Sequence, residues 1–100
     1  MKVYFVNVHY DNGEYYEDQY DFDRIEKIFS TKEKALAYIN GLKPEDMDKD
    51  GEEVWVEGNP YPSAKPQNII RSFYHEKDPK YYDNTCETYD YSITERKVDV

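Results

Sequence analysis

Residues 46–57 carry acidic side chains at the spacing of a calcium-binding loop. The stretch DMDKDGEEVWVE fits the pattern D-x-D-x-D-G-x5-E, in which carboxylates and one backbone carbonyl supply the oxygen ligands that calcium needs. The ligand positions hold Asp46, Asp48, Asp50 and Glu57, which offer carboxylates, and Glu52, which offers its backbone carbonyl. The helix that normally leaves such a loop is opposed by Gly58-Asn59-Pro60. Two interpretations therefore stay open, a calcium-binding module and a plain acidic turn between a helix and a strand.

Side chains suited to catalysis are few. The chain has two histidines, His9 and His75, and a single cysteine, Cys86, and none of them lies in a recognisable nucleophile motif. A single cysteine excludes an internal disulfide and a zinc site of the Cys-x-x-Cys type. Acidic pairs abound, but nothing marks one pair as acid and base. We therefore expect a protein that is not an enzyme and has no cofactor, unless calcium binds residues 46–57.

The charge of the chain is unevenly distributed. Asp and Glu number 22 against 13 Lys and Arg, which gives a formal net charge of −9. Residues 9–23 and 45–57 together carry −12, and the remainder carries +3. Such segments repel nucleic acid and attract basic proteins, although charge runs are also commonly solvated surface that promotes solubility. The residues expected to contact a partner are Asp11, Glu14, Tyr15, Tyr16, Glu17, Asp18, Asp21 and Asp23, followed by Glu52, Glu53, Trp55 and Glu57.

Tyrosine replaces leucine in the expected core. Leu, Ile, Val and Phe total 19 residues, a share that usually indicates disorder when the net charge is high. The chain also has 12 Tyr and 1 Trp, which predicts a folded domain whose rings pack while their hydroxyls reach water or a partner. No apolar run is long enough to span a membrane and no signal peptide is apparent. We expect a cytoplasmic protein that contacts no membrane.

The first third of the chain predicts a hairpin. Residues 3–10 (VYFVNVHY) are rich in Val, Tyr and Phe and predict a strand that is apolar on both faces, as in the middle of a sheet. Asn12-Gly13 predicts a two-residue type I′ turn, because both residues tolerate a positive φ. Residues 14–20 then form the returning strand, with a continuation through residues 25–29.

A capped helix follows this hairpin. Ser30-Thr31-Lys32-Glu33 has the pattern of a capping box, with Ser30 as the N-cap and Glu33 reaching back to its amide. The helix is predicted from residue 31 to about residue 41, where glycine and then proline end it. Its apolar stripe consists of Ala35, Leu36, Ile39 and Leu42.

The remaining elements complete an α+β fold. Residues 53–57 predict a short strand, residues 68–75 a strand or one helical turn, and residues 87–98 a half-buried strand with Tyr89, Tyr91 and Ile93 on one face. We predict a single domain over residues 1–100 with a small, mostly antiparallel sheet and one helix packed on one face. Its ββαβ core would carry an irregular insertion after the helix, at about residues 43–88.

Parts of the chain resemble a loose family of small uncharacterised ββαβ proteins of Gram-positive bacteria and their phages. The similar stretches are VYFVNVHY, DRIEKIFSTKEKALAYI and the closing YSITERKVDV. The resemblance implies the ββαβ core and transfers no catalytic residue, because the shared positions are a strand end, a cap and a helix stripe.

From sequence we therefore expect a small acidic protein-binding protein that is not an enzyme. Its partner would be a protein with a basic surface, and the chain itself would not bind nucleic acid directly. The resemblance to phage proteins suggests an inhibitor of a host defence or nucleic-acid-handling protein, acting in the host cytoplasm through a surface that imitates DNA. The calcium-binding module and a housekeeping domain of unknown role are the alternatives.

Overall fold

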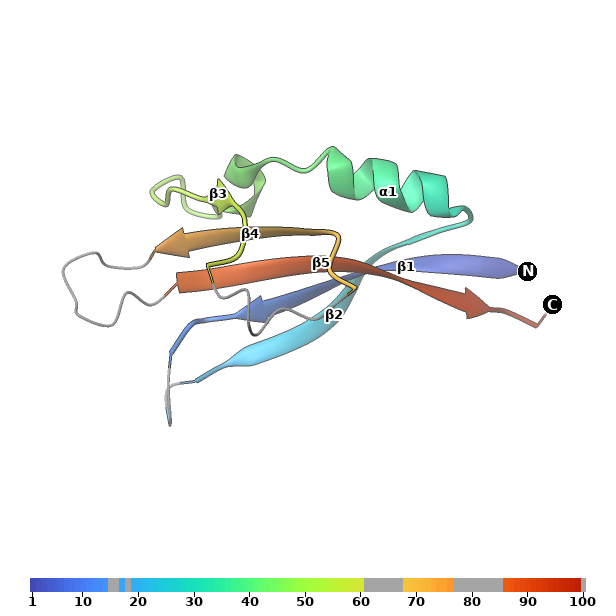
Figure 1. The fold of residues 1–100 in the computed structure, drawn as a ribbon, viewed down its shortest axis with the longest axis horizontal. Coiled ribbons are helices and arrows are strands. Elements are labelled where there is room, and N and C mark those ends of the chain that lie inside the picture. The colour runs from blue at the N-terminus through green and yellow to red at the C-terminus, as the bar shows by residue number, and fades with distance from the viewer. Residues whose placement is uncertain (15–16, 18, 61–67, 77–85, 100) are drawn as a thin grey trace.

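In the part of the chain that the structure describes, five antiparallel strands form one sheet in the spatial order β2-β1-β5-β4-β3, and one α-helix lies against one of its faces (Figure 1). The computed structural model describes residues 1–14, 17, 19–60, 68–76 and 86–99. The elements in chain order are β1 (Lys2–Asp11), β2 (Asp21–Phe29), α1 (Lys32–Asn40), the 3-10 helix η2 (Pro44–Met47), β3 (Val56–Glu57), β4 (Arg71–Glu76) and β5 (Cys86–Lys97). The small α+β fold with an antiparallel sheet and one α-helix is confirmed. No helix in the described part of the chain is long and apolar enough to cross a membrane.

The sheet is larger than the predicted ββαβ core. β1, β2, α1 and β5 correspond to that core, and β5 lies between β1 and β4. The segment expected to be an irregular insertion adds η2, β3 and β4, so it extends the sheet by two strands. Sequence alone left residues 68–75 open between a strand and one helical turn, because RSFYHE mixes polar and apolar side chains on both faces, and the structure forms the strand β4 there.

The hydrophobic core lies between α1 and one face of the sheet, which we call the helix face. Its most deeply buried apolar side chains are Val6, Val8, Ala35, Ile39, Phe73, Tyr89 and Tyr91. Two of these side chains are tyrosines, so tyrosine does serve as a core residue here. Burial of a large apolar side chain contributes about 1.5–3 kcal/mol. The hydroxyl of Tyr91 donates a hydrogen bond to the thioether sulfur Sδ of Met47, 3.6 Å away.

The opposite face of the sheet has a polar centre. Asp90 of β5 is buried, and its Oδ1 accepts hydrogen bonds from Ser72 Oγ at 2.5 Å and from Asn59 Nδ2 at 3.1 Å. These bonds satisfy the carboxylate in a region where an unpaired charge would be costly. They also attach the segment after β3 to the middle of the sheet.

The β1–β2 hairpin differs from the prediction in its turn and its register. A two-residue turn at Asn12-Gly13 would pair Phe5 with Tyr20, whereas Phe5 pairs with Ile28 and the last ladder pair is Asp11 with Asp21. The predicted returning strand at residues 14–20 is therefore wrong for its described residues, and only its continuation forms β2. The physical reason is that turn side chains take up backbone amides that a tight hairpin would use in its ladder.

The helix starts one residue later than predicted. Thr31, not Ser30, is the N-cap, and its Oγ1 accepts a hydrogen bond from the amide of Lys34 at 3.2 Å. This bond satisfies one of the free amides of the first turn. Of the predicted stripe, Ala35 and Ile39 are fully buried and Leu42 packs against the core, whereas Leu36 is only half-buried.

Arg71 attaches the end of α1 to the sheet. Its Nη1 donates to the carbonyl oxygens of Ile39 at 2.8 Å and Leu42 at 2.6 Å, just where helical carbonyls lose their partners. Its Nε donates to Glu57 Oε1 at 2.7 Å, and its guanidinium lies 4.7 Å from the centre of the Phe73 ring. One side chain therefore joins α1, β3 and β4.

Candidate functional site

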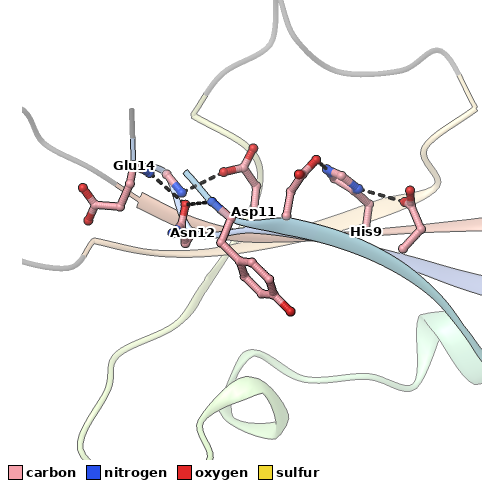
Figure 2. A network of polar contacts seen from close by, with 8 residues as sticks. His9, Asp11, Asn12 and Glu14 are labelled. Atoms are coloured by element: carbon pink, nitrogen blue, oxygen red, sulfur yellow. Dashed lines mark hydrogen bonds and ion pairs between the residues drawn. The ribbon is translucent and has the colours of Figure 1, made fainter. Parts of the chain in front are cut away.

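Three aspartates gather at the end of the sheet where β1 and β2 approach their connecting loop. Asp11 pairs with Asp21 and His9 pairs with Asp23, so these four side chains lie on the face opposite α1. His9 lies between two of the carboxylates, with Nδ1 2.8 Å from Asp23 Oδ1 and Nε2 3.7 Å from Asp21 Oδ2 (Figure 2). We call Asp11, Asp21 and Asp23 the acidic hairpin patch. In Figure 1 it lies at the end of the sheet away from the two chain termini.

Hydrogen bonds from side chains to backbone amides hold the start of the connecting loop. Asp11 Oδ1 accepts from the amide of Gly13 at 2.7 Å, and Asn12 Oδ1 accepts from the amides of Glu14 at 3.0 Å and Tyr20 at 3.1 Å (Figure 2). The amide of Asn12 donates in turn to the carbonyl of Tyr20 at 3.0 Å. Gly13 has φ 74°, and a Cβ there would collide with the backbone of Cys86. The loop therefore begins in a fixed conformation against β5.

The patch places like charges in direct opposition. Asp11 and Asp21 face each other across the ladder, an arrangement that destabilises an antiparallel pair. Asp23 is 82% exposed and Asp21 is 50% exposed, so both carboxylates can reach a partner. Among the described residues, His9 is the only basic side chain that forms an ion pair with the patch. The patch therefore carries negative charge that the described fold does not neutralise with Lys or Arg.

The other predicted contact residues of the first acidic segment lie in the connecting loop. Glu14 is half-buried and Glu17 is exposed. Tyr15, Tyr16 and Asp18 lie outside the described residues. The structure thus brings Asp11, Asp21 and Asp23 together on one face and leaves the aromatic part of the prediction untested.

The second acidic segment is spread over different environments. Trp55 is only 6% exposed and packs against Tyr89 and His75, with ring centres 5.2 and 5.4 Å apart. The prediction that Trp55 contacts a partner is therefore wrong, because its ring belongs to the core. Glu52 is exposed, whereas Glu57 forms an ion pair with Arg71. The hydrogen bond from Arg71 and the charge of its guanidinium both lower the pKa of Glu57.

Several carboxylates of the calcium-like loop already have backbone or side-chain partners. Asp46 Oδ2 accepts from the amide of Lys43 at 2.8 Å, and Asp48 Oδ1 accepts from the amides of Asp50 and Gly51 at 3.2 and 2.9 Å. No exiting helix begins near the end of the loop, because its last two residues, Val56 and Glu57, form the short strand β3. A calcium ion would have to compete with Arg71 for Glu57. Calcium binding by this loop stays a prediction.

A second cluster of chemically active groups lies on the helix face. Glu53, His75 and Glu87 present ligand atoms that lie within 4.8 Å of one another. His75 of β4 and Glu87 of β5 are cross-strand partners, and the loop before β3 brings Glu53 over them, 3.3 Å from His75 Nε2. Burial and the charge of Glu87 raise the pKa of Glu53. We call these three residues the Glu–His–Glu cluster.

Sequence reasoning missed this cluster. His75 and Glu87 become neighbours only through the β4–β5 register, which no local pattern encodes. In the sequence, His75 lies in no recognisable nucleophile motif, and Glu87 belongs to no motif. The one available signal was the alternation of residues 87–93, which places Glu87 on the same face as Tyr89 and Tyr91.

Comparison of the chain with protein-family models, with curated proteins and with solved structures gives no match. The arguments for function below therefore depend on the residues and their geometry.

Proposed function

We propose that the protein is a small acidic binding protein, not an enzyme, which uses the acidic hairpin patch to bind the basic surface of a partner protein. The observation that carries this proposal is the direct opposition of Asp11 and Asp21 across the hairpin. Opposed carboxylates cost stability in the free protein. A cationic partner that lies over both removes this repulsion, so binding and relief of strain act in the same direction.

The spacing of the patch suggests which basic surfaces it fits. Asp21 and Asp23 are two residues apart on one strand, so their carboxylates repeat at about 6.6 Å along it. Asp11 adds a charge on the neighbouring strand. Proteins that bind nucleic acid present Lys and Arg side chains to a dense row of phosphates. We therefore propose as partner the nucleic-acid-binding surface of a protein, such as a host defence nuclease in the case of a phage product, and place the interaction in the cytoplasm.

Capture of partners with a matched pair of variants tests this function. The first variant is Asp11→Asn, Asp21→Asn and Asp23→Asn, which removes three charges from the patch without changing side-chain size. The control is Glu33→Gln, Glu45→Gln and Asp99→Asn, which removes three charges from exposed positions elsewhere. We expect capture by the wild type and the control, loss of capture by the patch variant, and weakening between about 50 and 200 mM salt.

Competition with duplex DNA identifies the class of partner. A captured protein whose nucleic-acid-binding surface is occupied must be released by added DNA, since both ligands use the same cations. Equal capture by the patch variant and the control would refute the role of the patch. Capture that survives an excess of DNA would refute the proposed class of partner.

A further inference from the structure

We infer that the Glu–His–Glu cluster is a binding site for a divalent first-row transition metal ion, with Zn²⁺ as the expected occupant. Its protein ligands are Glu53, His75 Nε2 and Glu87. The inference is independent of the proposed partner binding, because the cluster lies on the helix face and the acidic hairpin patch lies on the opposite face.

The orientation of His75 prepares one ring nitrogen for a cation. Its Nδ1 is 3.0 Å from the carbonyl oxygen of Val54, which can only accept, so Nδ1 carries the proton and donates. In the neutral ring Nε2 then holds the lone pair, and this atom faces Glu53 Oε2 at 3.3 Å. A histidine whose second nitrogen donates to a backbone carbonyl is the usual arrangement of a metal-ligating imidazole.

Three acceptors that converge without a donor repel one another. With Nε2 unprotonated, the lone pair and the two carboxylates need a positive charge between them. A proton on Nε2 supplies one unit of charge, whereas a divalent ion supplies two and neutralises both carboxylates. Asp48 and Asp50 add negative potential near Glu53, which further favours the doubly charged ion.

Neighbouring side chains support the cluster from outside. The hydroxyl of Tyr10 donates to Glu87 Oε2 at 2.8 Å, which fixes the orientation of that carboxylate and leaves Oε1 for an ion. Trp55 packs against the His75 ring, and its buried Nε1–H has no hydrogen-bond partner among the residues that the structure describes.

The ligand types select the kind of metal. One imidazole nitrogen and two carboxylate oxygens suit zinc and its first-row neighbours, whereas calcium and magnesium prefer oxygen alone. His75 is 15% exposed and Glu53 is 26% exposed, so the site is partly buried but open to an ion from solution. Three protein ligands leave a fourth position for water.

Trp55 provides a direct readout, because it is the only tryptophan of the chain and its ring centre is 5.4 Å from that of His75. The full-length protein is titrated with Co²⁺, which quenches nearby indole emission, and then with Zn²⁺, which should displace it. Calorimetry with Zn²⁺ gives the stoichiometry in an excess of Mg²⁺. We expect saturable quenching, recovery with Zn²⁺, and one ion per chain.

Variants at matched positions separate the cluster from the general negative charge. Glu87→Gln and Glu53→Gln should each weaken Zn²⁺ binding by more than about tenfold. Glu53 lies in a loop, so its substitution disturbs folding less than a substitution within the sheet. Tyr10→Phe removes only the positioning hydrogen bond and should weaken binding by about tenfold. Glu76→Gln makes the same charge change beside His75 but on the other face, and should leave the affinity unchanged.

Three results would overturn the inference. The first is the absence of saturable quenching and of heat, which is the result expected if a proton on His75 Nε2, and not a metal ion, lies between the two carboxylates. The second is equal Zn²⁺ affinity in Glu53→Gln, Glu87→Gln and Glu76→Gln. The third is binding that Ca²⁺ competes away and that Asp48→Asn abolishes, which would assign the metal to residues 46–57.

Discussion

Replacing Arg71 by methionine should destabilise the fold by detaching α1 from the sheet. Methionine keeps most of the stem that packs on Phe73 but loses every donor of the guanidinium. The two bonds to the carbonyls of Ile39 and Leu42, at 2.8 and 2.6 Å, are each worth about 1.5–3 kcal/mol for a charged donor. The contact with the Phe73 ring adds about 0.5–1 kcal/mol.

The expected loss is smaller than the sum of these terms, because one nitrogen serves both carbonyls and water can reach the helix end once the side chain is gone. We expect Arg71→Met to cost about 3 kcal/mol. With a urea dependence of about 1.5 kcal/mol per molar, the unfolding midpoint should fall by about 2 M.

Urea unfolding followed by circular dichroism measures this shift, and Glu57→Gln is the matched comparison. That variant removes the ion pair with Arg71 but leaves both carbonyl bonds intact, and exposed ion pairs contribute little. We expect its midpoint to fall slightly, and by far less than that of Arg71→Met. A shift below about 0.5 M for Arg71→Met, or equal shifts for the two variants, would refute the view that the helix carbonyls are what Arg71 stabilises.

Three further perturbations test separate parts of the fold. Asp90→Ala removes the acceptor of two hydrogen bonds and should cost about 2–3 kcal/mol in urea unfolding, whereas no loss would show that those bonds are unimportant. Gly13→Ala forces a side chain onto a positive φ and against the backbone of β5, so its melting temperature should fall clearly, and an unchanged value would contradict the loop geometry. The pKa of Glu57 is lowered by Arg71, so the stabilisation should be complete above about pH 5 and disappear as the pH falls through the lowered pKa. Melting of the wild type and Glu57→Gln as a function of pH checks this, and a difference that persists at low pH would contradict it.

Local patterns predicted the elements that depend on neighbouring residues. The alternation of Tyr89, Tyr91 and Ile93 and the helical spacing of Ala35 and Ile39 both identify core faces correctly, because burial alone decides these positions. Tyrosine takes core positions that leucine commonly occupies, since a phenol ring buries a large apolar area.

The parts that failed depend on contacts between distant residues or on competing side-chain bonds. The Asn12-Gly13 dipeptide indicated a tight turn, but the bonds of Asp11 and Asn12 to loop amides stabilise a longer connection. The capping-box pattern selects Ser30, which has Glu33 three residues later, whereas the extended backbone at Thr31 places its hydroxyl on the amide of Lys34 and makes Thr31 the N-cap.

The candidate site was predicted in part. The concentration of acidic residues is visible in the sequence, but their distribution over the two faces is not. Trp55 appeared as an exposed anchor within an acidic run, and only the β4 and β5 packing shows that it is buried. His75 and Glu87 are brought together by a strand pairing with no local signal.

The central claim, that the acidic hairpin patch binds a basic nucleic-acid-binding surface, is tested most directly by one capture measurement. The amount of partner retained is compared for the wild type, the variant that neutralises Asp11, Asp21 and Asp23, and the control that neutralises three other acids, with and without duplex DNA. The account predicts retention by the wild type and the control, release of both by DNA, and loss in the patch variant. Retention by the patch variant equal to that of the control would contradict it.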